Sequence, residues 1–512
     1  MNMTRRALLA SASFAAIAAS LPGSARAQAK ATLTVRVDRD ADVLDPAFRT
    51  GVNEGNIIRA VFQRLVTISP GSGEIVLDAA ESVTQASPSV VEFKLKPGQM
   101  FTGGFGEMTA EDVKFSYERF AVAPVGGKES PYKGDWVGLK AVEVTDKYSG
   151  RIVMEKPRAN LFNVALADVS GCIVSKKAVE QLGVAHNTKP IGSGALMVES
   201  VERQRQAVLK RNPDYKGPKP GFEEVIVRFV QDPKTTELAL RSSEIDFASL
   251  PPSQSETLAK VSGLVVTHQP GIANVWMGIN IEKPPFTDIR VRKAVRMALD
   301  VDQMLLAGYD GKADRANCLV MPQVVGHWKE APAQKRDVAG AKKLLAEAGM
   351  PNGFKTRITV LNQPVYQTMA LVAQALLRDV GIIVEIEGLD GGAFFASGKG
   401  DVGKNLDMFI IRFNGKLDPN FLAQWFVSSQ VGVWNWQRWA SPEYDALIDQ
   451  AAVELDVGKR AGLMVQAQKL MEDSAAFIWL TYDVSYFVSR SWLKPALLPS
   501  GIDWALDRFA PV

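Results

Sequence analysis

Residues 355–389 constrain the fold of this chain more than any other stretch. "KTRITVL" (355–361) reads as a strand and "VYQTMALVAQALLRDV" (365–380) as a helix, and "IIVEIEGL" (382–389) follows Gly381 as a second strand. A strand, a helix and a strand in this order normally lie in one sheet with the two strands parallel. The stretch therefore predicts a parallel or mixed sheet covered by helices.

The rest of the chain alternates strands and helices in the same way, without repeats. Thr109 followed by Asp112, and Ser441 followed by Pro442, are strong helix-start signals, and Asp337 is a third. Strands such as "ATLTVRV" (31–37) separate these helices. We therefore expect an α/β fold in two lobes, each with its own sheet. A ligand is expected between the lobes, where a concave surface and hinge motion coincide.

The first 27 residues are typical of an export signal. Arg5 and Arg6 precede a small, mildly apolar core, and "ARA" at 25–27 is an A-x-A cleavage site. "MTRRALLA" also resembles a twin-arginine signal, although Thr4 and Leu8 depart from its strongest form, so the twin-arginine and general secretion routes both stay open. We predict export to the periplasm with cleavage after Ala27. No later stretch approaches 18 uninterrupted apolar residues, so no internal membrane span is expected.

Removal of the signal makes the chain neutral. The precursor has 59 Lys and Arg against 56 Asp and Glu, and three arginines lie in the signal, which leaves 56 of each sign. A neutral chain argues against a broad electrostatic surface for nucleic acid.

No pattern in the chain asks for catalysis or metal binding. The three histidines, His186, His268 and His327, are far apart and match no metal-ligand spacing. "GSGALM" (192–197) lacks both the nucleophile elbow and the phosphate-loop ending. Cys172 and Cys318 could pair in an oxidising compartment, but they are 146 positions apart in dissimilar contexts, which favours free thiols. We expect no enzyme activity and no cofactor.

Several ordered segments carry a family resemblance. They include "DADVLDPAFRTGVNEGNIIRAVFQRLVTI", "FKLKPGQMFTGGFGEMTAEDVKFSYERF", "KPIGSGALMVES", "FTDIRVRKAVRMALD" and "ASPEYDALIDQAAVELD". Together they resemble the bacterial extracellular solute-binding proteins, family 5, the peptide, opine and nickel receptors of ABC importers. The resemblance covers nearly all of the chain after the signal.

The resemblance implies a two-lobed periplasmic binding protein fold of type II, with three domains (cluster C-like), mixed sheets and a hinge. Domain I would comprise 28–70, 185–270 and 486–512, domain II 71–184 and domain III 271–485. The protein would act as a monomer that closes on a small solute and docks on a membrane permease. The ATPase subunits would not touch it, and nucleic acid would not bind.

Two positions depart from the dipeptide-binding members of the family. Those members hold the peptide's amino group with an aspartate after the strand that corresponds to "MFII", where this chain has Asn414, Gly415 and Lys416. They hold the carboxylate with an arginine after the strand that corresponds to "KTRITVL", where this chain has Asn362 and Gln363. Both departures weaken the case for a free dipeptide. They suit an opine, a sugar-conjugated amino acid or a modified peptide.

Tryptophans near the predicted cleft suit a flat or sugar-like solute. In "VWNWQRW" (433–439) a strand would place Trp434 and Trp436 on one face, while Trp439 is expected in the core. The predicted ligand contacts are Thr50, Gly51, Asn53, Trp276, Asn362, Gln363, Tyr366, Arg412, Phe413, Asn414, Lys416, Trp434 and Trp436.

Two other functions stay open at this point. A receptor of the same family for chelated nickel needs no protein ligands to the metal, so the small number of histidines does not exclude it. A periplasmic hydrolase is the alternative from a different class, because carboxylates distant in sequence can meet in a fold.

Overall fold

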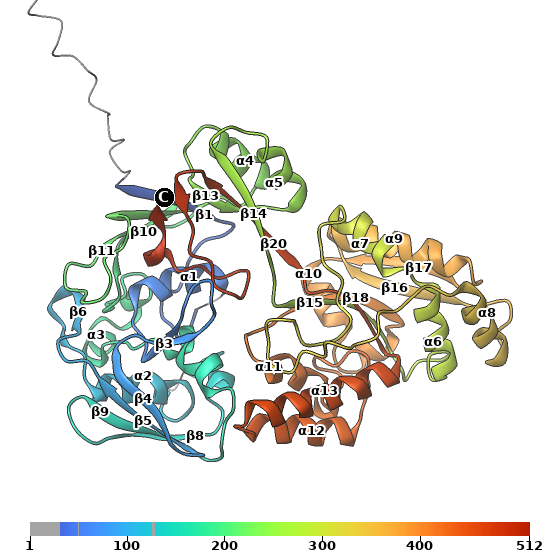
Figure 1. The fold of residues 1–512 in the computed structure, drawn as a ribbon, viewed down its shortest axis with the longest axis horizontal. Coiled ribbons are helices and arrows are strands. Elements are labelled where there is room, and N and C mark those ends of the chain that lie inside the picture. Colours follow the sequence, from blue (N-terminus) through green and yellow to red (C-terminus); the bar gives the residue numbers. More distant parts are fainter. Residues whose placement is uncertain (1–30, 50, 125–127) are drawn as a thin grey trace, which may run out of the picture.

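The computed structural model describes residues 31–49, 51–124 and 128–512, which form two lobes side by side (Figure 1). Thr50 and the predicted signal, residues 1–27, lie outside the described residues. The α/β prediction in two lobes is confirmed, since each lobe is built around its own mixed sheet. Among the described helices, none combines the length and apolar character needed to cross a membrane.

The first lobe contains a seven-stranded sheet made from distant parts of the chain. Strand β1 is parallel to both neighbours, β12 and β13, and every residue of β1 after Thr32 is buried. Strand β20, which comes near the end of the chain, lies between β13 and β14 in this sheet. In sheet order the strands are β10 (Leu196–Glu202), β11 (Gln206–Arg211), β12 (Glu224–Phe229), β1 (Thr32–Val37), β13 (Phe247–Ser249), β20 (Val484–Arg490) and β14 (Leu264–Pro270).

A second sheet of the first lobe packs on helix α2 (Ala110–Ala121). Thr109 and Asp112 form the predicted capping box at the start of this helix. The helix buries Val113, Tyr117 and Phe120 in a core that also contains Trp136. The sheet order is β4 (Ala80–Ser87), β5 (Val90–Leu95), β9 (Ser149–Met154) and β8 (Leu139–Val144).

The second lobe contains the predicted strand–helix–strand unit. Strands β16 and β17 are parallel, and α9 (Pro364–Arg378) connects them and packs on both, which confirms the prediction. Strand β18 lies next to β16 in the middle of the sheet. The sheet order is β17 (Ile383–Leu389), β16 (Lys355–Leu361), β18 (Met408–Asn414), β15 (Ala273–Ile279) and β19 (Phe477–Thr481).

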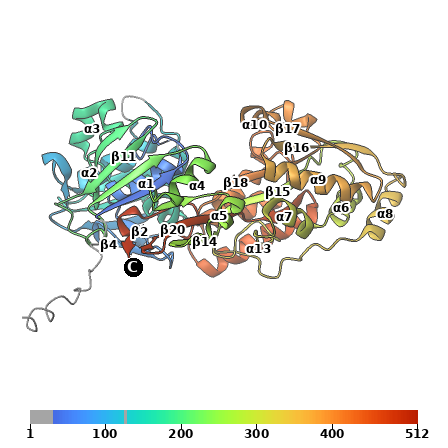
Figure 2. The same cartoon turned by 90° about the horizontal axis from the view of Figure 1, so that it is seen from above.

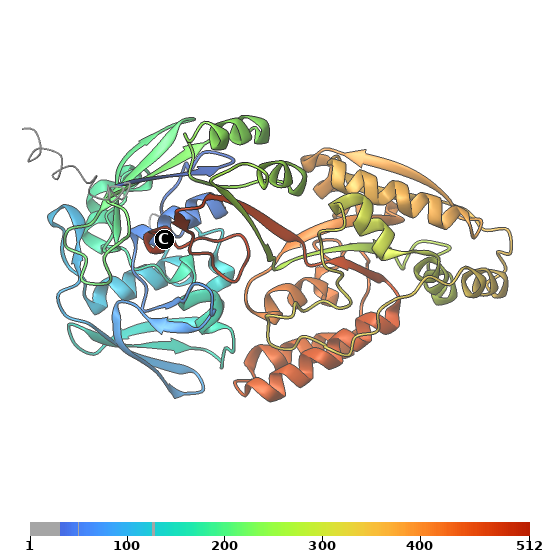
Figure 3. The same ribbon diagram turned by 45° about the horizontal axis from the view of Figure 1, so that its top comes forward.

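Helices cover this sheet, and several begin where the sequence predicts. Asp337 accepts a hydrogen bond from the Gly340 amide at the start of α8, and Ser441 accepts one from Tyr444 at the start of α12. In Figure 3, α12 and α13 run along the lower edge of the second lobe, and the Ala159 amide of the first lobe donates to the Ala452 carbonyl at 3.0 Å. The covering helices are α6 (Ile289–Ala298), α7 (Val301–Tyr309), α8 (Val338–Glu347), α10 (Gly391–Ser397), α11 (Pro419–Ala423), α12 (Pro442–Val453) and α13 (Val457–Ser474).

Shorter elements complete the first lobe. The helices are α1 (Val52–Val61), α3 (Lys176–Leu182), α4 (Pro233–Arg241) and α5 (Pro252–Leu258). The small strands are β2 (Val66–Ile68), β3 (Ile75–Leu77), β6 (Met100–Phe101), β7 (Gly106–Glu107), β21 (Leu493–Lys494) and β22 (Ala510–Pro511). The predicted domain borders stay predictions. The border at 70/71 would cut the β2–β3 hairpin, and the border at 485/486 would cut β20.

Two segments of the described chain cross between the lobes. One joins β14 to β15 through Gly271, and the other joins β19 to β20 through Asp483. They lie side by side, because the Gly271 amide donates to the Asp483 carbonyl at 3.3 Å. Asp483 has a left-handed backbone conformation, with φ of 63°. Figure 2 shows these strands as the narrow connection between the lobes. Cys172 and Cys318 lie in different lobes, and both are free and buried.

Candidate functional site

A cavity of about 460 Å³ lies between the lobes, close to this hinge. Residues of both lobes line it, as expected for a site that closes around a ligand. It is also mixed in character, with charged groups on the first lobe facing an aromatic wall on the second. Its lining includes Arg39, Arg49, Gly51, Arg59, Tyr132, Asp168, Asp503, Asn414, Lys416, Phe421 and Trp425.

A second interlobe cavity, of about 740 Å³, lies on the other side of Asn414, which lines both. Helix α5 of the first lobe supplies Pro252, Ser253 and Gln254 to one wall. The opposite wall, from the second lobe, includes Tyr309, Gln363, Tyr366, Phe394, Phe395, Arg412 and Asp483. The exposed end of β18 therefore separates two compartments of one interlobe region.

Strand β18 brings its polar end to this position because its apolar part is locked in the sheet. Met408 to Ile411 are buried, and the strand pairs with β15 along its whole length. Beyond Asn414 the backbone passes so close to the hinge that a Cβ at Gly415 would lie 2.2 Å from the Ile272 carbonyl oxygen. Glycine is therefore required there, and Lys416 follows it directly into the cleft.

Lys416 is not a free cation in this structure. Its ammonium lies 2.9 Å from the Asp135 Oδ2 and 3.3 Å from the Asp168 Oδ2, both on the first lobe. Its own side chain and both carboxylates are largely buried, with 16%, 8% and 16% of the side chains exposed. A buried charge without a partner is costly, so these contacts favour the arrangement of the lobes seen here, in which the lysine meets both carboxylates.

Two arginines complete a network of charges around Asp168. Arg59 contacts the Asp168 Oδ1 at 2.7 Å and the Asp503 Oδ1 at 2.8 Å. Arg49 stacks on the Tyr132 ring at 3.6 Å, and its nearest carboxylate oxygen, on Asp135, is 4.0 Å away. Burial by itself would raise the pKa of Asp168, but Lys416, Arg59 and Arg49 together lower it well below its usual range. Asp168 is therefore an anion at neutral pH.

Another ion pair connects β18 to the hinge. The Arg412 Nε lies 2.5 Å from the Asp483 Oδ2, and the Arg412 Nη1 donates to the Asn414 side chain at 2.6 Å. Burial raises the pKa of the neighbouring Tyr366 to about 12, so its phenol stays protonated. Arg412 thus couples the end of β18 to the segment that must bend when the lobes move.

The structure brings together about half of the predicted ligand contacts. Gly51, Asn414 and Lys416 line the first interlobe cavity, and Gln363, Tyr366, Arg412 and Asn414 line the second. Asn362 is exposed and bonds to Gln367 and Asp390 on its own lobe. The Asn53 side-chain amide donates to the Asp38 carboxylate at 2.8 Å, so it shapes the loop behind the cavity.

The predicted aromatic contacts need correction, because most of these rings lie in the core. Trp276 and Trp436 are each 1% exposed and Phe413 is 3% exposed, and none lines either interlobe cavity. Trp436 packs on Phe394 and Phe409. The segment around Trp434 is a turn and not a strand, so the expected common face does not form. Trp439 is buried, as predicted.

Three rings that the sequence interpretation missed line the first interlobe cavity, namely Trp425 and Phe421 of the second lobe and Tyr132 of the first. Trp425 is the largest of them. Trp434 lies behind it, half-buried, with ring centroids 5.3 Å apart and nearly parallel planes. Arg39, Asp135 and Asp168 were also missed. Asp135 sits in a short 3-10 turn and Asp168 directly precedes another, and no local pattern there distinguishes a cleft residue from a surface one.

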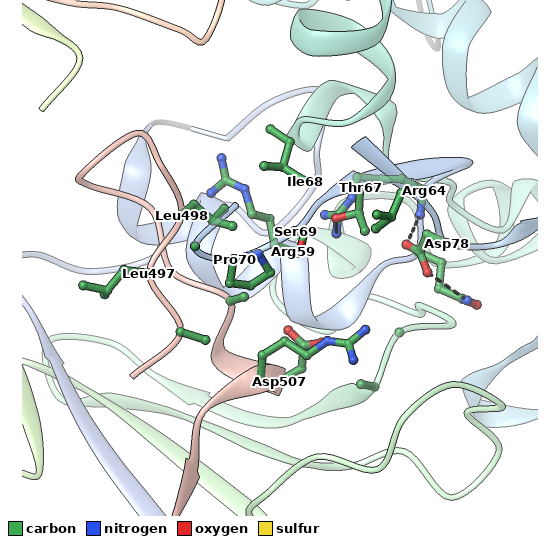
Figure 4. Close-up of a pocket in the computed structure, with 18 of the residues that line it drawn as sticks. Arg59, Arg64, Thr67, Ile68, Ser69, Pro70, Asp78, Leu497, Leu498 and Asp507 are labelled. Atoms are coloured by element: carbon green, nitrogen blue, oxygen red, sulfur yellow. Dashed lines mark hydrogen bonds and ion pairs between the residues drawn. The ribbon is translucent and has the colours of Figure 1, made fainter. Parts of the chain in front are cut away.

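A third cavity, of about 690 Å³, lies inside the first lobe next to the cleft (Figure 4). Arg59, Ile68 and Leu498 line both this cavity and the first interlobe cavity. Arg64 donates to Thr67 at 2.9 Å, and its backbone amide donates to Asp78 at 2.8 Å. In the part of the chain that the structure describes, no group of three or more His, Cys, Asp or Glu side chains is placed to hold a metal ion.

The family model of the bacterial extracellular solute-binding proteins, family 5, matches residues 74–434. The chain belongs to this family. It is a substrate-binding protein of the ABC importer class, and it works with a membrane permease. Members of the family are periplasmic.

Curated and solved relatives agree with this membership. The chain is 28% identical, over 91% of each sequence, to a probable D,D-dipeptide-binding periplasmic protein of Escherichia coli K12. A structure of a protein from A. tumefaciens R10 in complex with mannopinic acid superposes with a TM-score of 0.75 at 26% identity, and covers 94% of this chain and 100% of that one. HbpA2 from Haemophilus parasuis has a TM-score of 0.85 at 23% identity, with the same coverage, which shows the shared two-lobed fold.

Proposed function

We propose that the interlobe cleft binds a small organic anion of the peptide, opine or sugar–amino acid type. The observation that carries this proposal is Arg39. It is exposed, it lines the first interlobe cavity, and no carboxylate of the described residues lies within 4.0 Å of its guanidinium. Arg49, Arg59 and Lys416 face carboxylates of the protein, so Arg39 is the cation that a ligand carboxylate would meet.

The aromatic wall suits the rest of such a solute. Trp425 and Phe421 present rings to the same cavity from the second lobe, and Tyr132 presents one from the first. Trp425 is held in place by its stacking on Trp434. Aromatic faces pack on aliphatic side chains and on the apolar faces of sugars, while the polar edges of the cavity fix orientation.

The named relatives support an amino acid-derived solute. One is named for D,D-dipeptides, and one was solved with mannopinic acid. Both ligand classes carry carboxylate groups, which fits the cationic side of this cleft. The departures at Asn362 and at Lys416 favour the opine or modified-peptide type over a simple dipeptide.

The mechanism follows from the two lobes. A solute that contacts both lobes binds the closed form more tightly than the open form and shifts the population towards closure. We propose that the closed monomer docks on the permease, that the ATPase subunits do not touch it, and that it performs no covalent chemistry. We further propose that it is exported to the periplasm and that residues 1–27 are removed after Ala27, by either secretion route.

A ligand screen on residues 28–512 tests the proposal. Mannopinic acid, D,D- and L,L-dipeptides and nickel–histidine should be compared by thermal shift and calorimetry. A true ligand at 100 times its dissociation constant adds about 2.7 kcal/mol of stability. Binding of nickel–histidine alone would favour the nickel receptor. Turnover of a peptide or ester without any stabilisation would favour the hydrolase.

A further inference from the structure

The lysine at the end of β18 occupies a site built for an ammonium group. Lys416 belongs to the second lobe, and the two carboxylates around it, Asp135 and Asp168, belong to the first. Asp135 also accepts a hydrogen bond of 2.5 Å from the Ser170 hydroxyl. Beside the lysine, the Asn163 side chain of the first lobe donates to the Leu417 carbonyl at 3.1 Å. The lysine thus forms part of the contact between the two lobes.

The position of this lysine leaves it little freedom. Gly415 is fixed against the hinge by its close approach to the Ile272 carbonyl oxygen. Beyond it, the Lys416 ammonium lies 5.2 Å from the centre of the Phe421 ring. The ammonium is therefore directed at the two carboxylates by the backbone on one side and by an aromatic face on the other.

In the ion pairs of this network, counted within 4.0 Å, the charges are equal in number without any ligand. The cations are Arg49, Arg59 and Lys416, and the anions are Asp135, Asp168 and Asp503. Without the lysine, these ion pairs would have one buried carboxylate in excess. An ammonium group would remove that excess, since a buried charge needs a partner of opposite sign.

We propose that Lys416 is a built-in substitute for a ligand's amino group and thereby selects solutes that carry no free ammonium at this end. Such solutes are N-substituted or N-acylated amino acids and peptides. A free amino group placed beside Lys416 would bring a second cation to carboxylates that Lys416 already neutralises. The repulsion between the two ammonium groups discriminates against such a solute. The inference rests on the proposed function, because it names the class of solute for the same cleft.

The first experiment compares a dipeptide with its N-acetylated form by calorimetry. The protein should bind N-acetyl-dialanine at least tenfold more tightly than dialanine, and Lys416→Met should reverse this preference. Lys404→Met is the matched control, since Lys404 is exposed and pairs with Asp401 on the same lobe. The inference is wrong if the unmodified protein prefers dialanine, or if Lys416→Met leaves the preference unchanged.

The second experiment needs no solute. In Lys416→Ala, propylammonium has the same atoms that the substitution removes. Small-angle scattering should show that this variant is more open than the unmodified protein, and that propylammonium closes it again. Propylammonium should leave Lys404→Ala unchanged. A variant that stays compact, or that does not respond to propylammonium, overturns the inference.

The two experiments separate failure of the inference from failure of the proposed function. If propylammonium closes Lys416→Ala but neither peptide binds, the proposed class of peptide-like solutes is wrong, and the structural role of the Lys416 ammonium is supported. If both peptides bind with equal affinity and propylammonium has no effect, the cleft binds such solutes and the role of Lys416 is wrong.

Discussion

Two charged residues of one loop, Lys416 and Asp418, have opposite structural roles. Asp418 is buried within its own lobe, 2.7 Å from the Arg460 guanidinium, and its other oxygen accepts from the Asn420 amide at 3.0 Å. Lys416, two positions earlier, pairs only with the other lobe among the described residues. The first pair exists whether the lobes are open or closed, whereas the second exists only when they meet. The comparison shows that neighbouring ion pairs can serve stability and closure separately.

The largest expected effect comes from breaking the pair within the lobe. Asp418→Asn leaves the Arg460 charge buried without a carboxylate, which should lower the free energy of unfolding by about 3 kcal/mol. Urea unfolding would measure it, with an unchanged slope as the sign that stability alone has changed. The double variant Asp418→Asn, Arg460→Met should recover part of the loss. If the folded fraction of Asp418→Asn also lost ligand affinity by a comparable free energy, the two ion pairs would not have separate roles.

A smaller effect on stability and a clear effect on closure are expected for Asp168→Asn. The change removes one carboxylate from both Lys416 and Arg59, but Arg59 keeps Asp503. We expect about a tenfold loss of ligand affinity, which corresponds to about 1.4 kcal/mol, and a scattering profile that is more open without ligand. If unfolding stability falls by as much as in Asp418→Asn while closure is unchanged, this network is structural and the comparison fails.

Arg39→Ala should weaken ligand binding without affecting the ion pairs of Asp418 or of Lys416. The side chain is exposed and pairs with no carboxylate of the described residues, so the melting temperature without ligand should stay the same. The affinity for an anionic solute should fall about fivefold, and the affinity for the same solute as its methyl ester should not change. Calorimetry with the acid and the ester separates these outcomes. Equal losses for both would remove Arg39 as the carboxylate partner.

The smallest expected effect is that of pH on closure. The pKa of Asp168 is lowered in this structure by Lys416, Arg59 and Arg49. Because Lys416 belongs to the opposite lobe, the carboxylate stabilises the contact between the lobes fully above its ordinary pKa of about 3.9. The stabilisation is lost only as the pH falls below that value. Scattering of the ligand-bound protein should therefore be constant from pH 8 to 5. An opening transition centred near pH 6.5 would point to a histidine and contradict the assignment.

Local patterns predicted the fold well where one segment carries its own signal. The helix starts at Thr109, Asp337 and Ser441 form as expected, because a side chain caps a backbone amide only three residues away. The strand–helix–strand unit forms for a similar reason, since its spacing is encoded within 35 residues. The resemblance of ordered motifs then predicted the two-lobed receptor fold.

Prediction of the site was weaker because burial and pairing depend on distant segments. Trp425 and Trp436 are 11 positions apart, yet one lines the cleft and the other packs in the core. Lys416 looked like a candidate for a ligand carboxylate, but two aspartates more than 240 positions earlier already hold it. No feature of the sequence around the lysine predicts those partners.

By itself, the sequence determined the strands of the strand–helix–strand unit, the capped helices and the family, since these depend on periodicity, capping and ordered motifs along the chain. Only the tertiary structure decided which charges are matched and which remain for a solute. The reason is physical, because the energy of a buried charge depends on every charged and polar group within a few ångströms, whatever their separation in sequence. In this protein that proximity leaves Arg39 open in the cleft and places the Lys416 ammonium between carboxylates of the opposite lobe.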